Sequence, residues 1–399
     1  MTLEKIMQRK DGKPKRKALR LMPKFQYGFR DNPSTAAYRR ELWAGLHTPQ
    51  NQTIVSLFSG CGGLDLGFAG GFKFLGDDYK PLPFDVIQAI DNSEDAVTTY
   101  SLNLGSHVYL KDLTTLSVAE IPKANILLGG FPCQDFSSSG SKAGFAGKRG
   151  QLYQVLTDYM AYHQPEIVVG ENVPHLARLH GGVYLNTILR DFEREGYRFD
   201  VWDLFAPDYG LPQSRRRLFL IGVREDLAGY PVKPAPTHRH AHISIAEGLG
   251  DLESIADETV ANQSQYFVST RATSGGGQGD HTNNAEKVAY CIRANARGRI
   301  QFHYQLPRRL TVRECARLQS FPDEFVFPFS TQRNLTLIGN AVPPILGYHV
   351  ASAIRDFLNM PQKPSTIHRS AETDIVKKRV RPIQLGLFAN IPKDIEPVK

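Results

Sequence analysis

Five short apolar runs, separated by loops and helical patterns, constrain the fold of this chain more than any other feature. Each run is rich in Ile, Val, Leu or Phe, and they span 53–58, 84–90, 125–128, 166–169 and 218–223. Between the third and fourth runs, the apolar residues from Leu152 to Met160 are spaced to lie on one face of a helix. Strands that alternate with helices predict an α/β fold around a parallel, doubly wound sheet.

Glycine or polar residues follow four of these predicted strands. They are Gly60 to Gly63, Asp91, Cys133 and Glu171. In open α/β sheets, ligands bind outside the carboxyl ends of the strands. We therefore expect the four segments to converge on one crevice.

The first of these segments is a glycine-rich turn between a strand and a helix, Phe58-Ser59-Gly60-Cys61-Gly62-Gly63-Leu64. Glycines allow a cofactor to approach the backbone closely, and Asp91 after the next strand is placed to accept hydrogen bonds from ribose hydroxyls. The spacing differs from the dinucleotide pattern GxGxxG, which favours an adenosyl cofactor over a nicotinamide.

Two further segments carry reactive groups. Cys133 follows Gly129-Gly130-Phe131-Pro132 in a strand-to-loop turn, where a thiol is exposed enough to react, although a small buried packing residue is the alternative. Glu171 at a strand end facing a crevice can have a raised pKa and donate a proton, whereas an exposed capping residue is the alternative.

A third candidate is the arginine-rich segment from Gln213 to Arg217. Arg215 and Arg217 lie on the same side of an extended chain. Two arginines on one face suit a phosphate or a base edge. A solvated strand edge would have the same pattern.

Charge is concentrated at the N-terminus. Residues 1–30 contain ten Lys or Arg against Glu4 and Asp11, so their net charge equals the +8 of the whole chain. Such a segment suits non-specific phosphate contact, and a solvated tail is the alternative. The four cysteines are far apart and form no CxxC pair, so we expect neither disulfides nor a metal site.

Composition changes along the chain predict its division into segments. Residues 224–306 are rich in His, Pro, Ser and Gly, without the strand and helix alternation, and are expected to form a smaller loop-rich domain. The predicted parts are a basic extension (1–50), a catalytic and cofactor-binding domain (51–223), the loop-rich domain (224–306), a return segment (307–358) and a flexible tail (359–399). No apolar run approaches the roughly 18 residues of a membrane helix, and no signal peptide is evident, so an intracellular protein is expected.

Eight segments in order resemble the successive motifs of the DNA cytosine-5 methyltransferases of bacterial restriction-modification systems. They are FSGCGGLDLGF, AIDNSEDAV, KDLTTL, GGFPCQDFSSSG, GENV, DYGLPQSRRRLFLIGVR, RRLTVRECARLQSFPDEF and IGNAVPP, which together cover roughly residues 53–357. The resemblance implies a Rossmann-like domain that binds S-adenosylmethionine and faces a smaller target-recognition domain across a DNA-sized cleft.

The resemblance also implies roles for individual residues. Cys133 would be the nucleophile, Glu171 would protonate or hydrogen-bond the cytosine ring nitrogen, and Arg215 and Arg217 would hold the base and its backbone. The cofactor would be bound by residues from several motifs, namely Phe58, Gly60, Gly62, Gly63, Asp91 (ribose), Asp112 (adenine amino group), Asn340 and Val342. Asn92 departs from relatives that place an aromatic residue against adenine.

Chemistry on a base within a duplex requires that base to be flipped out of the stack. Phe136 to Lys148 is expected to be the mobile loop that closes over it, with Gln134 and Ser137 contacting DNA. The glycine-rich stretch from Ser274 to Asp280 resembles a recognition loop of some relatives, in which a glutamine fills the space that the base leaves. Gln278 would have that role, and an ordinary flexible turn is the alternative.

One tail motif falls outside the enzymatic pattern. Gln384-Leu385-Gly386-Leu387-Phe388 resembles the short peptides by which bacterial proteins dock on the replication sliding clamp. Chance occurrence, or packing against this protein, is the alternative.

The sequence therefore predicts an enzyme that methylates carbon 5 of cytosine at a short duplex DNA sequence, in the cytoplasm and associated with the nucleoid. A cognate restriction endonuclease would be its functional partner. Two alternatives are a cytosine-5 methyltransferase acting on transfer RNA and an inactive DNA-binding protein with the same fold. The target sequence and the oligomeric state do not follow from the sequence.

Overall fold

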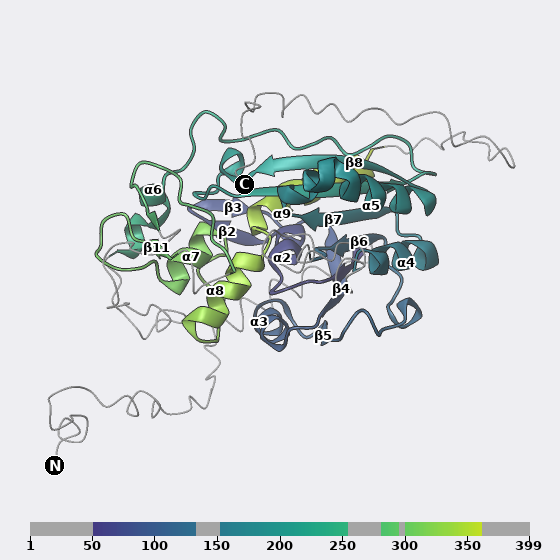
Figure 1. Ribbon diagram of the computed structural model, residues 1–399, viewed down its shortest axis with the longest axis horizontal. Coiled ribbons are helices and arrows are strands. Elements are labelled where there is room, and N and C mark those ends of the chain that lie inside the picture. The colour runs from purple at the N-terminus through teal and green to yellow at the C-terminus, as the bar shows by residue number, and fades with distance from the viewer. Residues whose placement is uncertain (1–50, 133–151, 254–280, 295–299, 361–399) are drawn as a thin grey trace, which may run out of the picture.

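The computed structural model describes residues 51–132, 152–253, 281–294 and 300–360, and a seven-stranded sheet forms its centre (Figure 1). The strand order is β5-β4-β1-β6-β7-β9-β8. The strands are β1 (Gln52–Leu57), β4 (Phe84–Asp91), β5 (Val108–Leu110), β6 (Ile126–Gly129), β7 (Ile167–Asn172), β8 (Tyr197–Phe205) and β9 (Arg216–Arg224). The chain runs from β1 outward to β5 and then returns to β6 beside β1, which creates the topological switch point where ligands bind in such sheets.

Each of the five predicted strands overlaps a strand of this sheet, but the prediction of a parallel sheet is wrong for β9. β9 runs antiparallel to both β7 and β8, whereas β5, β4, β1, β6 and β7 are parallel. The reason is that β8, which the sequence pattern missed, forms a hairpin-like pair with β9. β8 carries Arg198, Asp200 and Asp203 among its apolar residues and is only partly buried.

Helices cover both faces of the sheet. They are α2 (Gly63–Ala69), α3 (Glu94–Leu104), α4 (Gln154–His163), α5 (Val183–Arg194), α6 (Ile245–Leu249), α7 (Val312–Leu318), α8 (Thr331–Asn340) and α9 (Pro344–Leu358). Successive residues of β1 face opposite ways, so Ile54 joins the buried cluster beneath α2, α3 and α9, while Val55 joins the one beneath α4 and α5. The result is a three-layer α/β domain.

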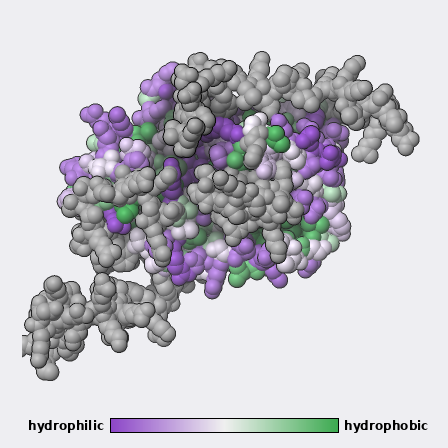
Figure 2. Space-filling view, in the orientation of Figure 1, coloured by the Kyte–Doolittle hydropathy of each residue, from purple (hydrophilic) through white to green (hydrophobic). Residues whose placement is uncertain are grey.

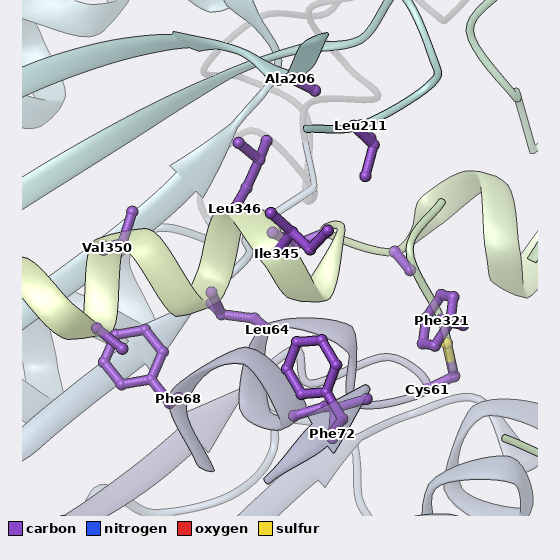
Figure 3. Packing of buried hydrophobic residues seen from close by; sticks show 14 of the residues in the cluster. Cys61, Leu64, Phe68, Phe72, Ala206, Leu211, Phe321, Ile345, Leu346 and Val350 are labelled. Carbon is purple, nitrogen blue, oxygen red and sulfur yellow. The ribbon is translucent and has the colours of Figure 1, made fainter. Parts of the chain in front are cut away.

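Helices α2 and α9 pack closely in the larger cluster, although they are far apart in sequence. Figure 3 shows Leu64 and Phe68 of α2 on one side of α9, and Leu346 on its other side, directed at Ala206. The approach depends on glycine, because a Cβ added at Gly67 would lie 2.5 Å from the Pro344 carbonyl oxygen. The C-terminal part of the described chain thus completes the domain that begins at β1.

The segment Thr331–Leu358 is long and apolar enough to cross a membrane, but 72% of its apolar 18-residue stretch is buried in the protein. It comprises α8 and α9, which are separated at Ala341 to Pro343. Figure 2 shows mainly hydrophilic residues on the visible described surface, with hydrophobic ones in small separate groups. The segment therefore has the properties of core helices.

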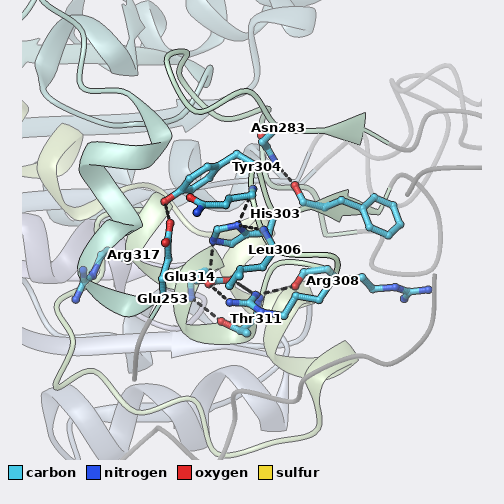
Figure 4. A network of polar contacts seen from close by, with 12 residues as sticks. Glu253, Asn283, His303, Tyr304, Leu306, Arg308, Thr311, Glu314 and Arg317 are labelled. Atoms are coloured by element: carbon cyan, nitrogen blue, oxygen red, sulfur yellow. Dashed lines mark hydrogen bonds and ion pairs between the residues drawn. The ribbon is translucent and has the colours of Figure 1, made fainter. Parts of the chain in front are cut away.

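The described parts of 224–306 do not form a core of their own. They contain α6, β10 (His281–Thr282) and β11 (Gln301–Phe302), and Ile245, Leu249, Ala289 and Ile292 belong to the larger cluster of the sheet domain. Polar contacts also join this segment to α7: Arg317 of α7 forms an ion pair with Asp251, and His303 Nε2 lies 3.7 Å from Glu314 Oε1 of α7 (Figure 4). A separate recognition domain remains a prediction, because 254–280 and 295–299 lie outside the described residues.

The remaining pair of strands, β2 (Phe72–Phe74) and β3 (Asp77–Tyr79), forms a small antiparallel hairpin after α2. The predicted basic extension and most of the predicted C-terminal tail also lie outside the described residues.

Candidate active site

The glycine-rich turn after β1 has an unusual backbone conformation. Phe58, Gly60 and Gly62 have positive φ angles of 56°, 57° and 89°, and positive φ in a residue other than glycine is a strained conformation that is typical of functional sites. The Gly60 N–H donates to Asp91 Oδ2 at 2.8 Å. Asp91 Oδ1 accepts from the Ser93 N–H at 2.9 Å. The ends of β1 and β4 are thereby joined at the switch point.

Groups in this turn fit an adenosyl cofactor. No atom lies within 4 Å of a Cβ built on Gly60, and the buried Ser59 hydroxyl has no hydrogen-bond partner among the described residues. Burial raises the pKa of the Asp91 carboxyl, and backbone N–H groups of Ser93 and Gly60 partly offset this shift. Each Asp91 oxygen retains acceptor capacity for a ribose hydroxyl. Open space at Gly60, the Ser59 hydroxyl and the Asp91 carboxylate therefore lie close together.

The other predicted cofactor residues surround the same region. A Cβ added at Gly63 would lie 2.2 Å from the Val342 carbonyl oxygen, so the turn contacts the α8–α9 junction directly. Asn340, the exposed last residue of α8, lies in that junction. Asp112 is exposed just after β5, whose Leu110 pairs with Asp91, and its Oδ1 accepts from Thr114 N at 2.9 Å. The structure thus places these residues around the ends of β1, β4 and β5.

Glu171 lies in β7 itself, not after it, and its carboxylate is buried beside Arg217. Arg217 Nε lies 2.9 Å from Glu171 Oε1. Burial raises the pKa of Glu171, and the charges of Arg217 and then Arg215 oppose that shift. Because β9 is antiparallel to β7, with Asn172 opposite Leu218, the start of β9 lies at the same sheet edge as the carboxyl ends of the parallel strands.

The chain that leads to Cys133 passes next to this carboxylate. Asn172 donates from Nδ2 to the Phe131 carbonyl oxygen at 2.9 Å, and a Cβ on Gly130 would lie 3.5 Å from Glu171 Oε2. The role of Asn172 in holding this turn was not predicted, although its position directly after Glu171 was a signal. Several predicted residues lie outside the described ones: Cys133, Gln134, Ser137, the loop 136–148, Gln278 and the tail motif 384–388.

Arg215 was predicted to hold the base, but the structure gives it other partners. Its terminal nitrogens donate to the carbonyl oxygens of Ile292, Gly339 and Ala341 at 2.9, 2.9 and 2.7 Å. The residue is 1% exposed, and burial lowers its pKa to about 10. Arg217, not Arg215, is therefore the arginine that contacts Glu171.

Two of the three cysteines among the described residues lack the exposure that a reactive thiol requires. Cys61 and Cys315 are buried, and burial raises the pKa of Cys61 to about 12. Cys291 is partly exposed and accepts from Arg215 Nη1 at 3.5 Å. Within the described ranges, no group of three or more His, Cys, Asp or Glu is arranged to hold a metal ion.

Comparison with known proteins agrees with this geometry. The model of the C-5 cytosine-specific DNA methylase family matches residues 52–356. The Type II methyltransferase M.BsuRI of Bacillus subtilis is 31% identical over 387 residues, covering 85% of this chain and 86% of that protein. M.NlaX of Neisseria lactamica, another Type II methyltransferase, is 34% identical and covers 72% of this chain and 91% of that protein.

Solved structures share the fold at low sequence identity. The Entamoeba histolytica methyltransferase EhMeth has a TM-score of 0.61 at 18% identity, covering 77% of this chain and 99% of that one. The S. pombe Dnmt2 methyltransferase has a TM-score of 0.55 at 19% identity, covering 77% and 100%. The predicted α/β methyltransferase fold, family and cofactor are confirmed. The chain belongs to the C-5 cytosine-specific DNA methylase family and transfers a methyl group from S-adenosylmethionine to carbon 5 of cytosine in DNA.

Proposed function

We propose that this enzyme methylates one cytosine within a short specific sequence of duplex DNA, as the modification enzyme of a restriction-modification system. Two similar proteins, M.BsuRI and M.NlaX, carry the name Type II methyltransferase. A cognate endonuclease that cuts the same unmethylated sequence would be the functional partner. Its substrate is chromosomal DNA, so the enzyme would be located in the cytoplasm, in association with the nucleoid.

The proposed chemistry begins with addition of the Cys133 thiolate to carbon 6 of cytosine. Carbon 5 is a poor nucleophile within the aromatic ring, and covalent addition at the neighbouring carbon, with a proton donated to the ring nitrogen by Glu171, makes it enamine-like. Bound S-adenosylmethionine supplies an electrophilic methyl group. Transfer of the carbon 5 proton to solvent water would then allow the Cys133 thiolate to leave and the aromatic ring to be restored, and Glu171 would regain its proton from the ring nitrogen.

The observation that supports this mechanism best is the buried pair of Glu171 and Arg217. Arg217 Nε fixes Glu171 Oε1 at 2.9 Å, while Glu171 Oε2 faces the Gly130 backbone, three residues before Cys133. Burial raises the pKa of the carboxyl, which favours the protonated form that an acid requires. Arg217 opposes full protonation, so it would hold the carboxylate after the proton is given up.

Access to the base would require flipping it from the duplex, at a cost of a few kcal/mol in stacking and pairing. We assign closure over the flipped base to the loop 136–148, with Gln134 and Ser137 as DNA contacts. Gln278 would fill the vacated position in the duplex. In the tail, Gln384 to Phe388 would dock on the replication sliding clamp, and failure of a peptide of residues 380–392 to bind purified clamp at high micromolar concentration would exclude this docking.

Methyl transfer from labelled S-adenosylmethionine to unmodified genomic DNA and to transfer RNA tests the proposal. Wild-type protein should label DNA, Cys133→Ala should not, and Cys315→Ala, which removes a buried thiol in α7, should retain activity. Bisulfite sequencing should place 5-methylcytosine within one short motif. Labelling of RNA alone would overturn the DNA assignment, and a fully active Cys133→Ala variant would overturn the covalent mechanism.

A further inference from the structure

Three buried polar side chains meet between the start of β9 and helices α7 and α8. Gln213, Arg215 and Gln319 are at most 1% exposed, and we call them the carbonyl clamp because most of their donors bind backbone carbonyls. Gln213 Nε2 donates to the Leu318 carbonyl at 2.8 Å and to Gln319 Oε1 at 2.6 Å. Gln319 Nε2 donates to the carbonyls of Ile338 and Ala341 at 3.1 and 2.8 Å.

The carbonyl clamp provides hydrogen-bond donors for the backbone carbonyls at the C-terminal end of α8. The last carbonyls of a helix have no partner within the helix. Here Arg215 binds those of Gly339 and Ala341, and Gln319 binds those of Ile338 and Ala341. A guanidinium at a helix C-terminus is also favoured by the helix dipole. The conformation of the turn that carries Asn340 and Val342 therefore depends on donors from two other segments.

The clamp also holds a second segment, residues 289–292. The Ile292 N–H donates to Gln213 Oε1 at 2.8 Å, and its carbonyl accepts from Arg215 at 2.9 Å. Ala289 forms backbone hydrogen bonds with Pro212 and Ser214. These residues belong to the region 224–306, which would lie on the DNA side of the molecule.

The two clamped segments touch each other. A Cβ added at Gly339 would lie 2.3 Å from the Ala294 backbone nitrogen, so the backbones are in direct contact there. Thr336 Oγ1 adds a hydrogen bond to the Ala294 carbonyl at 3.1 Å. Neither segment can move far without the other. The segment that carries Arg215 continues into β9, where Arg217 holds Glu171.

We propose that Arg215 is a positioning residue that sets the geometry of the cofactor turn at Asn340 to Val342 and of the recognition-side segment 289–294 together. It acts through backbone carbonyls and touches neither base nor phosphate. The inference rests on the proposed placement of the cofactor beside Val342. It explains why an arginine is needed there, because a single planar guanidinium reaches the carbonyls of two segments, whereas a lysine ammonium is a compact point charge.

Binding of S-adenosylhomocysteine without DNA, measured by titration calorimetry, tests the inference. Arg215→Lys should raise the Kd about tenfold, as expected for loss of one charge-assisted hydrogen bond. Gln319→Met removes two donors to the same turn and should also raise the Kd. Arg216→Lys changes the intervening residue, whose side chain is 50% exposed and pairs with Asp203, and should leave the Kd unchanged.

Steady-state kinetics separate positioning from direct contact. Arg215→Lys should raise KM for DNA as well as the cofactor Kd, without moving the pH profile of kcat. Weaker DNA binding with an unchanged S-adenosylhomocysteine Kd would show a direct DNA contact and overturn the inference. If Arg215→Lys does not fold, Gln319→Met decides, and an unchanged Kd there overturns it too. Wild-type protein that does not bind S-adenosylhomocysteine would overturn the proposed cofactor site itself.

Discussion

Arg217 Nε lies 2.9 Å from Glu171 Oε1, and each of these residues exposes only 9% of its surface. The two side chains come from neighbouring antiparallel strands, with Asn172 of β7 opposite Leu218 of β9. Removing one partner from such a buried pair leaves the other charge uncompensated. The pair therefore fixes the orientation of the carboxyl before any substrate binds.

Replacing Glu171 with Gln should remove the acid while preserving its size. We expect the single-turnover rate of methyl transfer to fall by about 10²- to 10⁴-fold, the usual contribution of general acid catalysis. Because burial raises the pKa of Glu171, the wild-type rate should decline as pH rises through that raised pKa, and the variant should lack this decline. Glu286→Gln, at an exposed position, is the control. An unchanged rate in Glu171→Gln would exclude the proposed acid.

Gly63→Ala should disturb the contact between the glycine-rich turn after β1 and the α8–α9 junction. The new Cβ would lie 2.2 Å from the Val342 carbonyl oxygen, which is backbone and cannot rotate away. Overpacking of this kind costs about 1–3 kcal/mol of unfolding free energy. Urea unfolding and cofactor titration should both show the loss. Gly250→Ala, where no atom lies within 4 Å of the new Cβ, should change neither, and a neutral Gly63→Ala would contradict the close contact.

Local sequence patterns were sufficient for four of the five parallel strands, and they missed the short edge strand β5. The runs that became β1, β4, β6 and β7 are nearly continuous apolar stretches, which is typical of strands buried on both faces. The glycines after β1 and the carboxylate of Asp91 could be predicted to converge because the ends of parallel strands share one sheet edge.

The antiparallel half depended on tertiary contacts that no local pattern contains. The alternation in Gln213 to Arg217 predicted that Arg215 and Arg217 lie on one side of the chain, and both are buried. Their partners differ, because Arg217 contacts Glu171 while Arg215 binds carbonyls of residues 77 to 126 positions away in sequence. The direction of β9 follows from its pairing with β8. The different partners of Arg215 and Arg217 could therefore not be predicted from the sequence.

Glu314→Gln should destabilise α7 and the segment that leads into it. Arg308 binds both Glu314 oxygens at 2.7 and 2.8 Å, and the Thr311 N–H donates to Oε2 at 2.8 Å (Figure 4). Breaking a buried ion pair by neutralising one partner costs roughly 3–5 kcal/mol. Urea unfolding measures this loss, with exposed Glu324→Gln as the control. Equal stability of the two variants would show that the pair contributes little.

Asp65 should make stability depend on pH. Its carboxyl is fully buried in α2 and accepts from Ser56 Oγ at 2.7 Å and from the Tyr100 hydroxyl at 2.8 Å, and Tyr100 also contacts His107 Nε2 at 3.0 Å. Burial raises the pKa of Asp65 to about 6, and the two hydrogen bonds oppose that shift. Between pH of about 4 and about 6, the folded protein therefore retains a proton that the unfolded chain has released.

The stability contributed by this proton is fully present below pH of about 4 and is lost as pH rises to about 6, by about 3 kcal/mol in total. Asp65→Asn cannot ionise, so the difference in unfolding free energy between wild type and variant should shift in favour of the variant by that amount between pH 4 and 7. Urea unfolding at several pH values measures it, with Asp77→Asn at an exposed position as the control. A difference that stays constant across this range would mean that Asp65 is ionised in the folded protein throughout, with Ser56 and Tyr100 compensating for its burial.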